Sequence, residues 1–211
     1  KTTSGKRPTS GYIPRFRNVY KQETDFLRGY ASNLSASRIV ENAHDLVGES
    51  LKNSLLAPKL GNWHINVGMM GETIPKAHST VRLDSQLKDK YGIPQLRVSI
   101  GYDENDEKML KDFHQQFTEM YEAAGFHNIK PIDTKRLPGN ENHEMGGVRM
   151  GRDPKTSMLN AFNQLHHCKN VFVTDGSCMT STSTQNPSLT YMALTARAVD
   201  YALKEKKKLN L

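Results

Sequence analysis

The stretch that decides the fold reads VFVTDGSCMTSTSTQNPSLT and covers residues 171–190. Its first four residues are apolar or β-branched and predict a short strand, which the turn residues Asp175 and Gly176 end. After a run of small polar residues, Asn186 and Pro187 predict the start of a final helix, with asparagine as N-cap and proline at the first helical position. The segment therefore predicts a strand, a turn and a helix, with polar groups gathered where the helix begins.

The final helix is predicted to combine an apolar stripe with an uncharged first turn. Its apolar side chains recur at helical spacing: Leu189, Met192, Ala193, Ala196, Val199 and Leu203. Because no acidic side chain stands in the first turn, its free N–H groups are available to an anion or to a partially negative carbonyl. Lysines crowd the other end, where cations complement the helix dipole.

Earlier in the chain, apolar residues alternate with polar ones and predict strands. The clearest alternation places Trp63, Ile65 and Val67 on one face and His64 and Asn66 on the other. Further strands are predicted at residues 12–16, 81–84, 96–100 and 130–134. Glycine and proline mark a turn between the middle two of these, which predicts an antiparallel sheet.

Two segments show helical spacing of apolar residues and predict helices at residues 37–56 and 105–124. The second helix is predicted to be capped by Asn105 or Asp106 and ended by Gly125. Helices and antiparallel strands in this order predict the α+β class, with a sheet backed by helices.

A stretch rich in proline, glycine and asparagine at residues 137–142 predicts a crossing between two domains. The first domain is expected at residues 1–138 and the second at residues 139–211. The abrupt, unpatterned start of the chain suggests that the first domain is truncated at its N-terminal side.

Composition excludes several classes of protein. The 211 residues are 36% hydrophobic, and none of their apolar runs approaches the ~20 residues that span a bilayer. The 29 basic and 22 acidic residues give a net charge of +7, but no basic stripe interleaved with aromatic residues indicates nucleic-acid binding. A soluble protein is expected, and its compartment, cytoplasmic or periplasmic, stays open.

The two cysteines are expected to be free thiols, and no metal is expected. Cys168 and Cys178 stand at opposite ends of a predicted strand, beyond disulfide reach. His166 and His167 beside Cys168 are a weak zinc pattern, because adjacent residues of an extended chain point to opposite faces.

His143 and Asn186 are the candidate catalytic residues, since a histidine and an asparagine that are distant in sequence could converge on one substrate hydroxyl. Taken singly, a histidine in a glycine-rich loop is more often structural, and an asparagine before proline is commonly an ordinary helix cap. Arg149 and Arg152 could anchor an anion, although a structural role is favoured because arginine suits backbone carbonyls equally well.

A different class of function also fits the first half of the chain. Trp63, His64 and Asn66 on the predicted sheet could form a non-catalytic carbohydrate-binding or interaction module that needs no cofactor.

The second half resembles a known family, the glucose–methanol–choline (GMC) flavin oxidoreductases. The residues that carry the resemblance are HEMGGVRMGRDP at 143–154, NVFVTDGS at 170–177 and NPSLT at 186–190, with weaker blocks IPRFRN at 13–18, FLRGY at 26–30 and DKYGIP at 89–94. The likeness is greatest to the sugar and gluconate dehydrogenase branch.

The resemblance implies an FAD-dependent enzyme that oxidises a hydroxyl of a sugar or polyol. His143 would be the general base facing the flavin N5 region, which receives the hydride, and Asn186 would hold the same substrate oxygen. The residues that the resemblance places against the cofactor are Asp175, Gly176, Asn186, Pro187 and Ser188. Asp175 would lie near the ribityl-diphosphate, and the final helix would face the N1/C2=O edge.

The chain departs from the family pattern in two respects. No Gly-x-Gly-x-x-Gly turn for the FAD diphosphate occurs in it, so the chain resembles a C-terminal portion whose N-terminal FAD-binding half is missing. Gly147 also stands where many relatives have threonine or serine. The electron acceptor, a partner protein or a quinone, and the choice between oxidase and dehydrogenase stay open.

Overall fold

The computed structural model describes residues 10–40, 45–57, 60–134, 136–140 and 142–211. In chain order the elements are β1 (Ser10–Ile13), β2 (Tyr30–Val40), α1 (Gly48–Leu56), β3 (Leu60–Gly71), β4 (Thr80–Lys88), β5 (Pro94–Ser99), α2 (Glu104–Ala123), β6 (Gln164–Leu165), β7 (Cys168–Phe172), a 3-10 helix (Gly176–Cys178) and α3 (Ser188–Lys207). Antiparallel strands combined with helices confirm the predicted α+β class.

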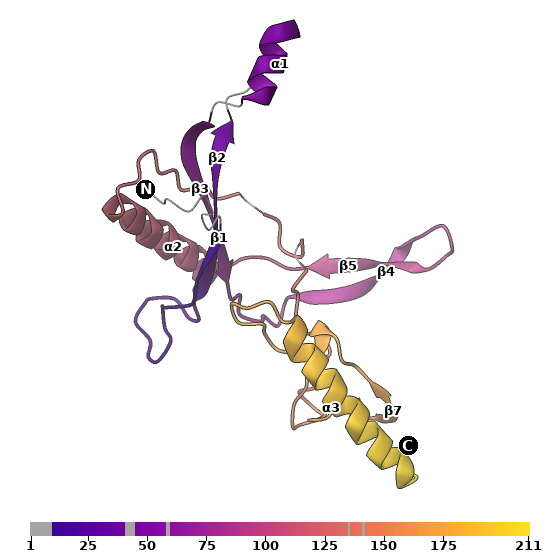
Figure 1. The fold of residues 1–211 in the computed structure, drawn as a ribbon. Helices are drawn as coiled ribbons and strands as arrows, with labels where there is room; N and C mark the ends of the chain where they lie inside the picture. Colours follow the sequence, from indigo (N-terminus) through magenta and orange to yellow (C-terminus); the bar gives the residue numbers. More distant parts are fainter. Residues whose placement is uncertain (1–9, 41–44, 58–59, 135, 141) are drawn as a thin grey trace.

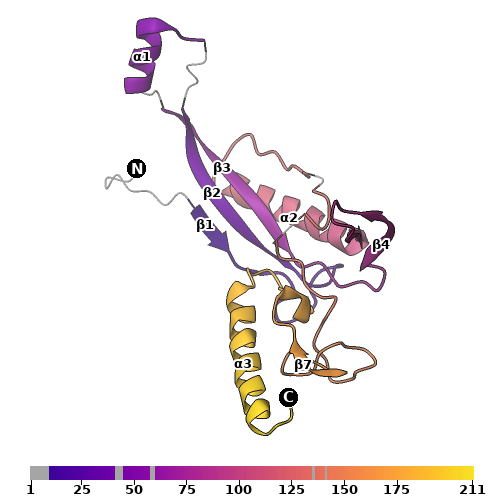
Figure 2. The same ribbon diagram turned by 90° about the vertical axis from the view of Figure 1, so that its right-hand side faces the viewer.

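The main sheet consists of β1, β2 and β3 in that order, all antiparallel (Figure 1). Figure 2 shows α2 lying along one face of this sheet, whereas α1 projects beyond the far ends of β2 and β3. The buried core lies between α2 and the sheet: Phe26, Tyr30, Met109, Phe113 and Phe117. The helical spacing of the last three aligns them on one face, which is why α2 packs against the sheet as predicted.

A capping box fixes the start of α2. The Asp103 carboxylate accepts a hydrogen bond from the Asp106 N–H at 3.2 Å, and the Asp106 carboxylate accepts one from the Asp103 N–H at 3.0 Å. Lys76 bridges both carboxylates and lowers the pKa of Asp103. The predicted cap at Asn105 or Asp106 is therefore wrong by a few residues, since Asn105 instead accepts a hydrogen bond from the Leu27 N–H at 2.7 Å.

Two sequence-based expectations are wrong, the first of them because strand pairing overrides local pattern. The helix predicted at residues 37–56 exists only as α1, while Ser37 and Arg38 pair with His64 and Trp63 as part of β2; residues 41–44 lie outside the described part of the chain. Residues 130–134 form no strand.

Away from the main sheet, β4 and β5 form a hairpin with two unlike faces. Val81 opposes Val98, and Leu83 opposes Leu96, so that one face is apolar. These four side chains are all more than half exposed. A second exposed apolar surface is the α3 face that carries Leu189, Met192, Val199 and Leu203, as expected of a helix that lacks part of its packing partner.

Removal of the Phe113 ring tests the core. Phe113 is 7% exposed and lies edge-on to the Tyr30 ring, with centroids 5.6 Å apart. Phe113→Ala is expected to lower the free energy of unfolding by about 3–5 kcal/mol, because it removes a buried ring and leaves a cavity. Urea unfolding followed by circular dichroism measures this change. Tyr20→Ala, at a fully exposed side chain, is the control, and equal losses for the two variants would contradict the proposed core.

Alkaline pH tests the environment of Tyr30. Burial and the hydrogen bond that its hydroxyl donates to Asp112, at 2.6 Å, raise the pKa of Tyr30. A group whose pKa is higher in the folded state contributes stability below its unfolded pKa of about 10, and this contribution is lost as the pH rises further. The free energy of unfolding should therefore fall above about pH 10.

Tyr30→Phe should be less stable at neutral pH, because it lacks the hydrogen bond, and should show a shallower alkaline fall. Urea unfolding across this pH range measures both effects, with Tyr20→Phe as the control. If the free energy of unfolding falls with the same slope above about pH 10 in Tyr30→Phe and in the parent chain, other groups cause the fall.

Candidate active site

The structure brings the side chains of His143 and Asn186 into contact across 43 residues of sequence. The Asn186 amide nitrogen Nδ2 lies 2.7 Å from His143 Nε2. On the other side of the ring, Nδ1 lies 2.9 Å from the carbonyl oxygen of Asn142. His143 is half-buried, whereas Asn186 is exposed. The two residues thus form a pair that solvent can reach.

These contacts define which nitrogen of the imidazole holds the proton. A carbonyl oxygen only accepts hydrogen bonds, so Nδ1 must carry the hydrogen that is donated to Asn142. The amide Nδ2 of Asn186 only donates, so Nε2 accepts with its lone pair. The arrangement therefore holds a neutral imidazole whose basic nitrogen faces the carboxamide.

Backbone pairing places His143 at this point. The segment that follows it runs beside the 3-10 helix Gly176–Cys178, with hydrogen bonds from the Gly146, Val148 and Met150 N–H groups to the Gly176, Ser177 and Cys178 carbonyls at 3.4, 3.2 and 2.9 Å. We call this pairing the site ladder. Gly146 and Gly147 have φ values of 92° and 93°, which glycine adopts without strain. At Gly147 this backbone conformation itself disfavours a side chain.

Asp175 and Gly176 stabilise the 3-10 helix side of the site ladder. The Asp175 carboxylate caps the 3-10 helix by accepting a hydrogen bond from the Ser177 N–H at 2.8 Å. A Cβ on Gly176 would lie 2.9 Å from Met145 Cε and 3.1 Å from the Glu144 carbonyl oxygen. The absence of a side chain at Gly176 thus lets the segment carrying His143 approach closely. The Asp175 carboxylate binds the backbone and side chain of Ser177 rather than His143 or Asn186.

The start of α3 differs from the prediction. The helix begins at Ser188 with Pro187 at the N-cap position, one residue later than predicted, and the Asn186 amide nitrogen lies against His143 Nε2. Pro187 offers no side-chain hydrogen bond, and its carbonyl accepts the N–H groups of Thr190 and Tyr191. In the described first turn the N–H groups of Ser188 and Leu189 therefore remain without a side-chain cap, and no acidic residue stands beside them.

The loop between the 3-10 helix and α3 is anchored by residues that sequence reasoning missed. Ser181 donates a hydrogen bond to the buried carboxylate of Glu72 at 2.6 Å. Gln185 donates one from its amide to the Tyr12 hydroxyl. Both partners lie more than 100 positions away in the sequence, and neither carries a local pattern that would have revealed it.

Other candidate groups take structural roles. Arg149 donates to the Thr156 carbonyl at 2.7 Å, in agreement with the structural reading of this arginine. Cys168 and Cys178 are both free, and burial raises the pKa of the Cys178 thiol, which keeps it protonated. Among the described residues, no group of three histidine, cysteine or acidic side chains is arranged to hold a metal ion.

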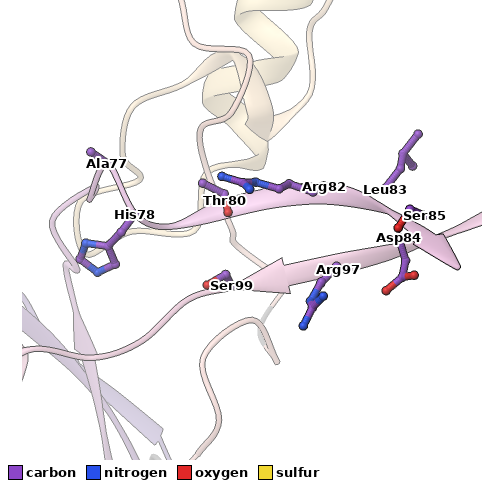
Figure 3. A pocket seen from close by; sticks show the side chains of 9 residues that line it. All are labelled: Ala77, His78, Thr80, Arg82, Leu83, Asp84, Ser85, Arg97 and Ser99. Carbon is purple, nitrogen blue, oxygen red and sulfur yellow. The ribbon is translucent and has the colours of Figure 1, made fainter. Parts of the chain in front are cut away.

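A separate hollow lies on the β4–β5 hairpin (Figure 3). Its polar lining includes His78, Thr80, Arg82, Arg97 and Ser99, with Arg82 directly opposite Arg97 in the strand pairing. The hollow contains neither His143 nor Asn186. Thr80, Arg82, Arg97 and Ser99 belong to the polar face of the hairpin, and Ala77 and Leu83 add apolar surface to the lining.

Comparison with known proteins identifies the class to which this fold and site belong. The sequence profile of the GMC oxidoreductases matches residues 75–195, which include His143, Asn186 and the site ladder. The chain belongs to the GMC oxidoreductase family.

Relatives in this family include dehydrogenases of polyols and sugars. The chain is 37% identical over 139 residues to 2-methyl-1,2-propanediol dehydrogenase of Mycolicibacterium austroafricanum, covering 65% of this chain and 25% of the relative. It is 31% identical over 138 residues to the fructose dehydrogenase large subunit of Gluconobacter japonicus, covering 64% and 24%. The matched region thus spans about a quarter of the length of these relatives.

Among solved structures, the crystal structure of pyridoxine 4-oxidase from Mesorbium loti is similar with a TM-score of 0.41 and 18% identity, covering 85% of this chain and 34% of that chain.

Within the described residues, no helix of the chain is both long and apolar enough to cross a bilayer.

A methyl group at Gly176 tests the site ladder. Gly176→Ala places a Cβ against Met145 and the Glu144 carbonyl, and the resulting displacement should lower the free energy of unfolding by about 1–3 kcal/mol. Urea unfolding measures the loss. Gly101→Ala is the matched control, because a Cβ there meets nothing within 4 Å. If both variants unfold at the parent midpoint, the close approach at Gly176 is incorrect.

Proposed function

We propose that the chain is the C-terminal part of an FAD-dependent oxidoreductase that oxidises a hydroxyl group of a sugar or polyol. The observation that carries the proposal is the contact between His143 Nε2 and Asn186 Nδ2, in a member of the GMC oxidoreductase family. An imidazole lone pair that faces an amide donor and can be reached from solvent suits the deprotonation of an alcohol.

The two side chains have distinct roles in this reaction. A substrate hydroxyl that enters between them donates its proton to His143 Nε2, while the Asn186 amide donates a hydrogen bond to the same oxygen. As the O–H bond breaks, negative charge develops on the oxygen, and the amide stabilises it. Asn186 cannot accept the proton, so His143 alone is the base.

When bound, FAD would supply the acceptor for the hydride that leaves the carbinol carbon. The start of α3 fits the N1/C2=O edge of such a ring, because its uncapped N–H groups and the absence of acidic residues favour a partially negative oxygen. Residues of this chain proposed to contact the cofactor are Asp175, Gly176, Asn186, Pro187 and Ser188. The chain offers no Gly-x-Gly-x-x-Gly turn for the diphosphate.

The domain organisation follows from this assignment. Residues 1–138 are proposed to form the substrate domain and residues 139–211 to return to the FAD domain, whose N-terminal half lies in a polypeptide outside this sequence. The exposed apolar face of α3 supports this, since an exposed stripe of this kind requires a covering partner.

The substrate class is taken from the relatives, which act on a diol, fructose and gluconate by their names. The electrons then pass to an acceptor protein or a quinone. A non-catalytic carbohydrate-binding module that uses Trp63, His64 and Asn66 is the second candidate. The exposure of these side chains on β3 is the observation in its favour.

Flavin reduction separates the two candidates. The chain is combined with the FAD-binding half of a family relative, and a polyol is added without oxygen. The oxidoreductase proposal expects a bound yellow flavin that bleaches. A complex that binds FAD but does not bleach with any of a diol, fructose or gluconate would overturn the proposal, whereas polyol binding without flavin would favour the module.

Substitutions in the same complex test the assigned roles. His143→Ala should lower kcat by about 10²–10⁴-fold, because the general base is lost. Asn186→Ala should lower kcat by about 10²–10³-fold, because one donor to the developing alkoxide is lost. His127→Ala, at an exposed histidine after α2, is the matched control and should leave the rate of bleaching unchanged. Full activity in His143→Ala would rule out its role as the base.

A further inference from the structure

Glu72 is a buried acid at the junction of the main sheet and the α3 loop. It follows directly after β3 and is 5% exposed. Two guanidinium groups lie near its carboxylate, Arg15 at 3.6 Å and Arg28 at 3.7 Å. Its N–H donates to the Gly29 carbonyl at 3.1 Å. A buried charge requires such compensation, so this carboxylate is fixed in place.

The Arg15 guanidinium is itself held independently of Glu72. It donates hydrogen bonds to the Arg17 carbonyl at 3.0 Å and to the Asn18 carbonyl at 2.6 Å. A Cβ on Gly29 would lie 2.8 Å from Arg15 Nε, so the missing side chain makes room for the guanidinium. The positive group opposite Glu72 is therefore part of a rigid frame at the edge of the sheet.

Ser181 connects this frame to the loop before α3. Its hydroxyl donates to Glu72 Oε1 at 2.6 Å and accepts from the Ser183 N–H at 2.9 Å. Ser183 has a φ of 58°, a left-handed conformation that a residue with a side chain adopts only when its surroundings enforce it. The carboxylate thus orients the hydroxyl, and the hydroxyl holds the turn.

The turn sets the position of Asn186, three residues further on. Between Ser183 and Asn186, Thr184 is buried, and Gln185 donates a hydrogen bond to the Tyr12 hydroxyl on β1. The loop therefore reaches Asn186 along a path that is fixed at successive points to the main sheet. His143 reaches the same place from the other side, along the site ladder.

We propose that Glu72 and Ser181 are positioning residues for the proposed reaction, which hold the Asn186 amide against His143 Nε2. This inference rests on the proposed function for its catalytic consequence, but its geometric content concerns only this chain. Neither residue touches the substrate. Their effect on the reaction passes through Asn186.

The first test measures the contact in the 211-residue chain without cofactor. Long-range ¹H–¹⁵N spectra of the histidine rings report the hydrogen bond that His143 Nε2 accepts. Asn186→Ala is expected to move this resonance, and Ser181→Ala and Glu72→Gln are expected to move it in the same direction. Ser181→Thr keeps the hydroxyl and should restore the parent position. Ser50→Ala, an exposed hydroxyl on α1, is the control.

An unmoved resonance in Ser181→Ala, together with a shift in Asn186→Ala, would overturn the positioning role and leave the proposed function intact. An unmoved resonance in Asn186→Ala itself would remove the contact and, with it, both proposals. If Glu72→Gln does not fold, Ser181→Ala alone decides, since it removes only a hydroxyl.

The second test is a double-mutant cycle in the flavin-loaded complex. Ser181→Ala should lower kcat by about 10–100-fold with a smaller change in KM, because misplacement of a catalytic group slows the chemical step. In the Asn186→Ala background the same change should cost less than about twofold, since its effect acts through the missing amide. Equal penalties in both backgrounds would show a merely structural role for Ser181 and overturn the proposal.

Discussion

The pairing of residues 146–150 with residues 176–178 is the constraint on which the second half of the structure depends. Three backbone hydrogen bonds join two segments that stand about 30 positions apart, and glycines with positive φ at 146 and 147 permit the path. This ladder fixes where His143 emerges. Without it, an imidazole in a loop rich in glycine would have no defined partner, and the start of α3 would have no base beside it.

The first half supplies the second constraint, a rigid frame against which the α3 loop is set. Its stiffness comes from an aromatic core between α2 and the β1–β2–β3 sheet, in which Tyr30 contacts both Phe26 and Phe113. The same tyrosine donates to Asp112, which also accepts two hydrogen bonds from Arg17. Tyr30 thus connects the aromatic core to the ion pair between Asp112 and Arg17. At the end of β3, Glu72 connects the same half of the chain to Ser181.

The chain buries its apolar residues unevenly. The α2 side of the main sheet is well packed, whereas α1, the apolar face of the β4–β5 hairpin and the stripe of α3 remain exposed. Apolar surface of this extent is normally covered in a folded protein. The uneven burial agrees with the match to about a quarter of the length of the family relatives.

Local pattern alone determined much of the secondary structure. The spacing of Met109, Phe113 and Phe117 defined α2, and the alternation around Trp63 and Val81 defined β3 and β4, because these periods are set by neighbours within a few residues. The sequence motifs also named His143 and Asn186 as a pair. Only the tertiary structure decided that residues 37–40 extend β2, since β3 supplies their hydrogen-bond partners.

Tertiary contacts likewise decided the partner of Asn186 and the anchors of the α3 loop. The Asn186 amide nitrogen lies against an imidazole 43 residues away, and Ser181 is oriented by a carboxylate 109 residues away. Such partners follow from the path of the whole chain. A periodicity that extends over one or two turns cannot encode them, so His143 and Asn186 could be named as a candidate pair from the sequence, while the groups that hold them in place could not.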